Sequence, residues 1–330
     1  MDVWLPLVFL VVMGLAMLAY VVLDGYDLGV GILLRRAEDE HKDTLIASIG
    51  PFWDANETWL VLGVGILLTA FPRAHGVILG ALYLPVALML IGLVLRGVAF
   101  DFRVKARAAH KPLWDRTFWA GSLLAAWSQG YMLGLWITGF ERNWATVAFA
   151  TFIGAALAAG YALLGAGWLI ARTEGELQRR AVAWARGALL LTALGVAAVS
   201  VATPLVSESV SARWFAWPRM AWLMPIPLAT ASLFVVAYRA LRTLPRPRDQ
   251  GRWIPFACTV GIFMLAFAGL AYSAYPYLVM DRITIWDAAS APESLRVILY
   301  GALVTLPAIV VYTVISYRVF RGKATELRYY

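Results

Sequence analysis

The sequence is poor in cysteine, histidine and charged residues. Of its 330 residues, only Cys258 is a cysteine, three are histidines and 15% are charged. A single cysteine excludes a disulfide framework or a cysteine-ligated cluster within the chain. Soluble domains are roughly one quarter charged, whereas this chain is 62% hydrophobic with a mean hydropathy of +0.73. The composition therefore predicts a polytopic membrane protein.

The few histidines restrict the cofactors that the chain can hold. His41, His75 and His110 lie between the apolar runs rather than within them. A haem inside a helix bundle usually takes histidine or methionine ligands, and methionines in apolar runs usually serve packing. We therefore expect this chain alone to bind neither a metal nor a haem.

Nine apolar segments approach the roughly 20 residues needed to cross a bilayer. The residues before the first segment lack the basic region of a cleaved signal peptide, so we expect that segment to remain as a helix. The pattern predicts an all-α integral membrane protein in which residues 1–330 form one polytopic domain. The predicted spans are Trp4–Leu34, Glu57–Phe71, Gly76–Phe102, Phe118–Phe140, Ala145–Ala171, Val182–Val206, Trp217–Leu241, Trp253–Met280 and Leu295–Phe320.

The basic residues of the loops predict the orientation. Nineteen lysines and arginines follow the odd-numbered spans and five follow the even-numbered ones. The positive-inside rule then places the N-terminus in the periplasm and the C-terminus in the cytoplasm. The net charge of +8 is divided among short loop clusters, so we expect no nucleic-acid partner.

The segment Gly50–Trp59 brings two carboxylates, Asp54 and Glu57, to the start of the second span. One interpretation is a capping box, in which Asp54 accepts the amide of Glu57 and Glu57 bonds back. The other is functional, because ionisable groups near the bilayer interior are costly and tend to serve ion or proton pathways. The spacing alone is compatible with both.

Two further polar groups lie at the ends of predicted spans. Asp24 and Asp27 share one helix face, either as a helix end where flanking glycines allow close packing or as a site where Asp27 relays protons or faces a cofactor. At the end of the third span, Asp101 and Lys105 are spaced for an ion pair four residues apart, and Arg96 precedes them on the same span. That group is either an interfacial pair or a cytoplasmic entrance for protons.

Four motifs together carry a resemblance to a known family. They are Asp24–Gly31, Gly50–Trp59, Arg96–Arg103 and Thr284–Glu293. In these motifs the chain resembles subunit II of the cytochrome bd-type quinol oxidases, most closely the cyanide-insensitive branch. The resemblance implies two four-helix bundles, at approximately 1–140 and 145–280, and a ninth helix at 294–320.

The resemblance also implies a respiratory enzyme that works only as a complex. A homologous subunit I would carry the haems, of b and d type, and the quinol-oxidising loop. The complex would oxidise quinol and reduce O2 to water in the bacterial cytoplasmic membrane. Cytoplasmic proton uptake would generate a proton-motive force. A structural quinone and a small single-helix third subunit are left open.

The resemblance assigns roles to six residues and no catalytic residue to this subunit. Lys105, Asp101 and Asp54 match a proposed hydrophilic path toward the partner's haem site, and Asp27 matches a carboxylate near the subunit interface. Arg96 matches a basic residue near that path, whereas Glu57 replaces a glutamine found in some relatives.

Two other functions remain as alternatives to this interpretation. A secondary transporter could use Asp27 and Asp54 as ion sites, but such proteins usually place binding groups in both matching halves. Here the acids concentrate in the first three spans. The second alternative is a scaffold subunit whose acids only stabilise the partner.

Overall fold

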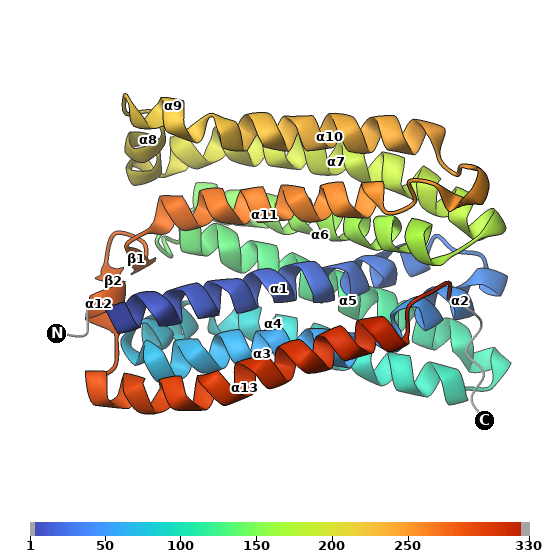
Figure 1. Cartoon of the computed structure of the whole chain (residues 1–330), viewed down its shortest axis with the longest axis horizontal. Coiled ribbons are helices and arrows are strands. Elements are labelled where there is room, and N and C mark those ends of the chain that lie inside the picture. Colours follow the sequence, from blue (N-terminus) through green and yellow to red (C-terminus); the bar gives the residue numbers. More distant parts are fainter. Residues whose placement is uncertain (1–3, 325–330) are drawn as a thin grey trace.

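The computed structural model describes residues 4–324 and consists mostly of long helices that run along one common axis (Figure 1). Their ends are joined by short loops, short helices and one small hairpin. The long helices are α1 (Trp4–Leu34), α3 (Trp53–Ala70), α4 (Pro72–Lys105), α5 (Lys111–Ile137), α6 (Trp144–Arg172), α7 (Gly175–Val206), α10 (Pro225–Thr243), α11 (Ile254–Ala274) and α13 (Pro292–Val319). The short elements are α2 (Asp39–Ile49), η1 (Ala108–His110), α8 (Glu208–Trp214), α9 (Arg219–Leu223), η2 (Pro247–Asp249), β1 (Tyr277–Val279), β2 (Ile283–Thr284) and α12 (Ile285–Ala288).

Each of the nine predicted segments is largely helical, and seven of the resulting helices are long and apolar enough to cross a membrane. The other two, α3 and α5, contain more polar residues. The first turns of α3 include Asp54 and Glu57, and the middle of α5 includes the buried Ser122 and Ser128. These polar groups lower the mean hydropathy of helices that pack within the bundle.

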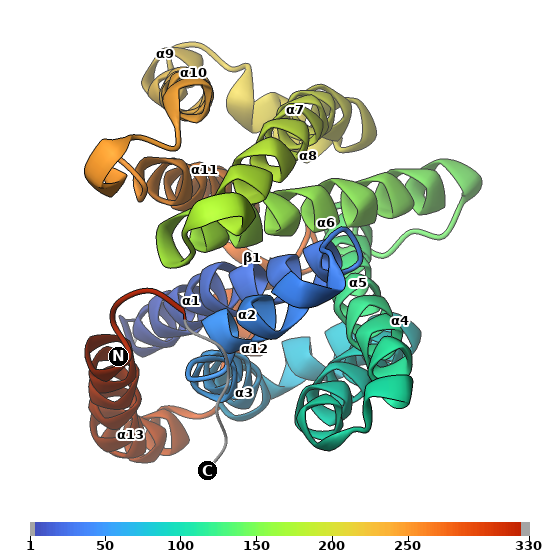
Figure 2. The same ribbon diagram turned by 90° about the vertical axis from the view of Figure 1, so that its right-hand side faces the viewer.

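The helix α6 lies at the centre of the packing. It contacts α1 and α5 on one side and α7 and α11 on the other, while α4 packs on α5 and α10 packs on α11. The helix α13 lies against α3 and α1 at the edge of the molecule (Figure 2). The end of α1, the α2 helix and the loops after α4, α6 and α10 share one end of the molecule (Figure 1). The basic loops of the sequence therefore gather at that end.

Glycines allow α1 and α6 to cross in close contact. A Cβ built on Gly29 would collide with the backbone of Tyr161 and Gly165, and one built on Gly165 would collide with the backbone of Gly29 and Val30. Small residues at such crossings let two membrane helices approach closely enough for dense van der Waals contact. The close-packing interpretation of the glycine-rich end of α1 is therefore confirmed for Gly29.

Replacing Gly165 by alanine should weaken this crossing. The added methyl group has only backbone to displace, so we expect a loss of about 1–3 kcal/mol in the free energy of unfolding. Thermal unfolding of the purified complex measures the loss. Gly187→Ala in α7 is the matched control, because a Cβ there has no neighbour within 4 Å. An equal response of the two variants would contradict the prediction.

Two predicted spans end or begin differently in the structure. The eighth was expected to continue to Met280, but α11 ends at Ala274 and the chain then forms the antiparallel pair β1–β2. Pro276 lacks the amide hydrogen needed to continue the helix. The indole of Trp136 donates to the Leu278 carbonyl at 2.8 Å, which ties the hairpin to the end of α5. The fold is therefore mostly helical rather than strictly all-α. The seventh span starts as the separate helix α9 before α10.

At the basic end of the molecule, the segment after α13 is bound to two other loops. Lys323 forms an ion pair with Asp249 at 2.6 Å and donates to the carbonyl of Thr173 at 2.8 Å. Gln178 donates to Asp249 at 2.9 Å, and Arg172 donates to the carbonyl of Phe320 at 2.8 Å. These contacts join the end of α13 to α6, α7 and the loop before α11.

The charge of Asp249 should contribute to stability in a pH-dependent way. Partial burial of Asp249 raises its pKa, but the hydrogen bonds from Gln178 and Lys323 outweigh this and lower the pKa to about 2. A depressed folded-state pKa gives stability that is present above the ordinary value near 3.8 and lost as the pH falls toward 2. Because solvent screens a group near the surface, we expect about 1 kcal/mol.

The variant Asp249→Asn isolates this charge, since asparagine also tolerates the positive φ of 54° at this position. We expect the wild type to unfold at a higher temperature than the variant at pH 6, and we expect the difference to shrink as the pH falls below 3.8 and to vanish below about pH 2. A difference that stayed constant with pH would show that the carboxylate charge is not its source.

Candidate functional site

A buried ion cluster joins α1, α3 and α4. Its centre is Arg96 of α4, whose side chain is only 2% exposed. One guanidinium nitrogen donates to Asp24 Oδ1 of α1 at 2.5 Å, and another pairs with Glu57 of α3. A buried guanidinium is costly without partners, and these two carboxylates supply them. Glu57 is 28% exposed, so the cluster reaches from the interior toward the surface.

A second polar group lies beside this cluster and is centred on Asn56. The Asn56 amide donates to Asp27 Oδ2 at 2.7 Å, and the Tyr317 hydroxyl donates to Asn56 Oδ1 at 3.2 Å. The hydroxyls of Tyr317 and Tyr26 are 2.6 Å apart. Tyr317 comes from α13, so the last helix completes the surroundings of Asp27.

Helical spacing explains how these side chains come together. Asp24 and Asp27 are three residues apart on α1 and therefore share a face. Asn56 and Glu57 are adjacent on α3 and diverge by about 100°, so one bonds to α1 and the other to α4. Local helix geometry thus orients the pair on α1 and the pair on α3, and tertiary packing brings the two pairs together.

The cluster retains polar atoms without protein partners. Within residues 4–324, Asp24 Oδ2, Asp27 Oδ1 and Arg96 Nε are buried and have no hydrogen-bond partner. Unsatisfied buried polar atoms are rare in proteins and call for a functional or water-mediated explanation. Each carboxylate here has one oxygen available to a proton or a water molecule.

The remaining predicted residues lie at the surface. Asp54, Asp101 and Lys105 are exposed. The predicted ion pair of Asp101 and Lys105 is wrong, because neither forms a salt bridge within residues 4–324. The capping-box interpretation of Asp54 and Glu57 is also wrong, since α3 begins at Trp53 and its N-cap receives no side-chain hydrogen bond. Glu57 bonds to Arg96 instead.

A second ion network, which the sequence did not predict, lies at the basic end of α4. Arg103 is 3% exposed and pairs with Asp115 of α5 and Asp43 of α2. Lys42 adds a 3.1 Å contact to Asp115. Burial raises the pKa of Asp43, but hydrogen bonds from Arg103 and Lys111 outweigh this and lower it. Arg103 resembled an ordinary loop cation in the sequence, and nothing local indicated its partners.

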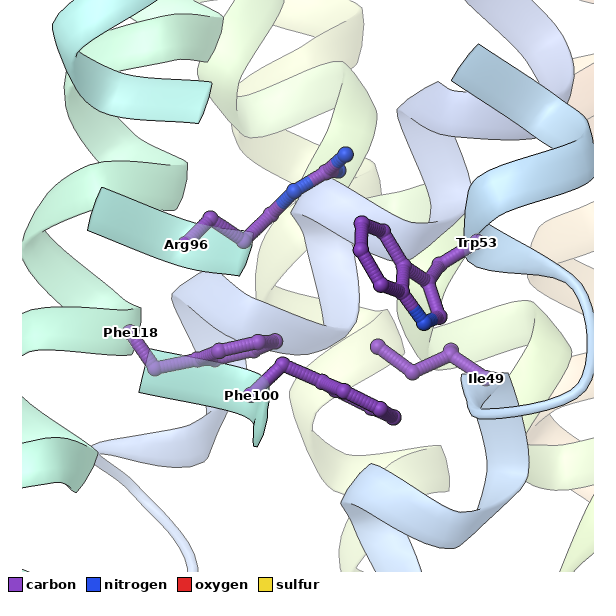
Figure 3. Close-up of a pocket in the computed structure, with 5 residues that line it drawn as sticks. All are labelled: Ile49, Trp53, Arg96, Phe100 and Phe118. Carbon is purple, nitrogen blue, oxygen red and sulfur yellow. The ribbon is translucent and has the colours of Figure 1, made fainter. Parts of the chain in front are cut away.

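A narrow pocket, too small to hold a water molecule, borders the ion cluster (Figure 3). Its wall is formed by Ile49, Trp53, Arg96, Phe100 and Phe118, and the guanidinium of Arg96 points away from the two phenylalanine rings. The rings of Trp53 and Phe100 lie 5.3 Å apart. The pocket therefore combines aromatic surfaces with one cationic group.

The histidines lie at helix ends in the structure. His41 belongs to α2, His75 to the first turn of α4 and His110 to η1. Glu38, Glu40 and His41 could approach one ion together, but Glu38 and Glu40 are exposed and Glu38 already accepts from Arg180 at 2.6 Å. This group by itself indicates no metal site.

The fold and the cluster define a class of protein: a multi-pass membrane protein with ionisable groups buried among its helices. A family model described as cytochrome bd terminal oxidase subunit II matches residues 5–320. The chain therefore belongs to the cytochrome bd terminal oxidase subunit II family.

Several characterised proteins share this similarity. The chain is 28% identical over 353 residues to the cytochrome bd ubiquinol oxidase subunit 2 of Bacillus subtilis, covering 98% of this chain and 97% of that one. It is also 28% identical over 373 residues to the cytochrome bd-I ubiquinol oxidase subunit 2 of Escherichia coli K12, covering 98% and 96%. These bacterial relatives and the apolar helices identify a multi-pass protein of the inner membrane.

The fold is shared with a solved structure. The bd oxidase from Geobacillus thermodenitrificans matches with a TM-score of 0.77 and 19% identity, over 96% of this chain and 98% of the matching chain. The family match thus agrees with the predicted resemblance, and the relatives' designation as subunit 2 implies a first subunit.

Proposed function

We propose that this chain is the haem-free subunit of an electrogenic quinol oxidase and supplies cytoplasmic protons to the site where its partner reduces O2. The observation that carries the proposal is the ion cluster of Arg96, Asp24 and Glu57, which extends from a partly exposed carboxylate into the protein interior. Carboxylates with a basic partner are typical of proton pathways within membranes.

The proposed topology has nine spans, with the N-terminus in the periplasm and the C-terminus in the cytoplasm. We assign α1, α3, α4 and α5 to the first four-helix bundle, α6, α7, α10 and α11 to the second, and α13 to the ninth span. The gathering of the basic loops at one end supports this orientation.

The proposed proton route begins at the exposed Asp101 and Lys105 and continues through Asp54. From Asp54 the proton passes to Glu57, which lies one helical turn further along α3. Arg96 holds Glu57 and Asp24 in place and balances their charge. Asp27 is the innermost carboxylate of the route, with Asn56 holding one of its oxygens.

The haems of the complex are proposed to reside in subunit I, where they would carry out quinol oxidation and O2 reduction. The positions of the three histidines support this division, because all lie at helix ends or in connecting segments. The function of the present chain is then to conduct protons and to stabilise its partner.

Because the haems are proposed to reside in subunit I, we predict that the present chain expressed alone binds no haem. We expect no Soret absorption above background from the isolated subunit and a full haem spectrum when subunit I is co-expressed. Circular dichroism of the isolated subunit is the control for folding. A stoichiometric haem spectrum from the folded, isolated chain would refute the proposal.

The space between Arg96 and the rings of Trp53, Phe100 and Phe118 is too narrow to hold a water molecule. It does not fit a quinone headgroup, so we assign no structural quinone to this position.

A further inference from the structure

An open apolar groove of about 450 Å³ runs along the outer surface of α5 and α6. Trp119, Leu123 and Trp127 line it from α5, and Ala155 and Ala158 line it from α6. Because the alanines are small, α6 leaves a hollow between the two tryptophans. From Trp119 to Trp127 the groove extends about 12 Å along the helix axis.

One end of the groove carries two cations. The Arg35 guanidinium at the end of α1 lies 4.6 Å from the centre of the Trp119 ring. Arg116 is exposed and precedes Trp119 by one turn of α5. Throughout residues 4–324, neither arginine forms a salt bridge, whereas the nearby Arg103 has two carboxylate partners. The end of the groove therefore presents positive charge without a counter-ion.

We propose that this groove binds one anionic phospholipid of the cytoplasmic leaflet. An acyl chain would lie between Trp119 and Trp127, and the phosphate would be bound by Arg35 and Arg116. Guanidinium groups bind phosphate oxygens through paired, charge-assisted hydrogen bonds. Basic pockets between membrane helices on the cytoplasmic side are suited to anionic headgroups.

The dimensions of the groove favour a lipid over a further protein helix. The apolar part of a membrane-spanning helix is about 30 Å long, whereas the groove extends only about 12 Å. A flexible acyl chain can fill a short hollow, and its own headgroup supplies the charge that the two arginines lack. One phospholipid then fills the apolar hollow and neutralises the two arginines at its end.

The test uses the intact oxidase, with its partner subunit, after delipidation in mild detergent. The probes are micelles that contain either phosphatidylglycerol or phosphatidylcholine, and native mass spectrometry counts the retained lipids. We expect one phosphatidylglycerol per complex at this site, retained about tenfold better than phosphatidylcholine. A wild-type complex that retained both lipids equally, or neither, would overturn the proposal.

Two variants locate the lipid on this chain. The double variant Arg35→Gln with Arg116→Gln should abolish the preference for phosphatidylglycerol, and Ala155→Phe should prevent retention of either lipid by filling the groove. Ala155 is exposed, so the larger side chain displaces lipid rather than core. None of these residues belongs to the ion cluster, so the haem spectrum and oxidase activity report whether each variant is assembled.

Arg242→Gln is the matched control. Arg242 is exposed at the corresponding end of α10 and lies 5.8 Å from the centre of the Tyr238 ring, but it borders neither of the two pockets described above. This variant should retain phosphatidylglycerol like the wild type. Equal loss in Arg242→Gln would attribute the preference to general surface charge, and retention by Ala155→Phe would exclude the groove.

Discussion

Replacing Arg96 by methionine should destabilise the subunit by about 3–5 kcal/mol, because the change leaves Asp24 as an uncompensated charge in the protein interior. Asp24 is fully buried and Arg96 is its ion-pair partner. We expect a large loss of assembled complex in the membrane and a lower unfolding temperature in what remains. Haem content per membrane protein and thermal unfolding measure the two effects.

The double variant Asp24→Asn with Arg96→Met tests whether charge is the cause. It removes the buried carboxylate together with its partner, and replacement of a buried ion pair by uncharged groups is often close to neutral. Assembly should therefore recover in large part. A double variant as unstable as Arg96→Met would show that packing around the guanidinium, rather than ion pairing, determines the loss.

The second large effect is expected from Asp54→Asn. If Asp54 passes protons to Glu57, the amide should slow O2 reduction by tenfold or more, which corresponds to about 1.4 kcal/mol in the barrier. Because Asp54 is exposed and makes no cap, the haems and the stability should be unaffected. Oxygen consumption and voltage generation in proteoliposomes measure the effect, and Asp54→Glu should restore much of the rate.

Glu208→Gln is the control for this experiment. Glu208 is also an exposed carboxylate at the beginning of a helix, but it lies on α8 at the opposite end of the molecule. Its replacement should leave the rate unchanged. Normal turnover by assembled Asp54→Asn would remove Asp54 from the route and favour the scaffold alternative.

The helices could be predicted from the sequence because hydropathy and length act locally. The bounds of α1 agree with the prediction at both ends. The hairpin was missed because Tyr277–Met280 is apolar, and a short apolar run does not distinguish a strand from a helix. Only Pro276 indicated that α11 stops earlier.

The site could be predicted less completely than the helices, because its contacts join residues that are far apart in the sequence. Arg96 was identified by its position in a span, but its partners lie 72 and 39 residues away. The spacing of four residues instead predicted an ion pair between Asp101 and Lys105. Both side chains are exposed, and an exposed ion pair contributes little to stability. Asn56 was missed although it stands between the two predicted carboxylates of α3.

The hydroxyl of Tyr317 has a consequence for biosynthesis. Asn56 and Asp27 enter the membrane early, on α1 and α3, whereas Tyr317 arrives only with α13, 261 residues after Asn56. During translation, Asn56 therefore lacks the hydrogen bond from Tyr317 until α13 has been made. A chain truncated before α13 would leave the buried side-chain oxygen of Asn56 without this donor.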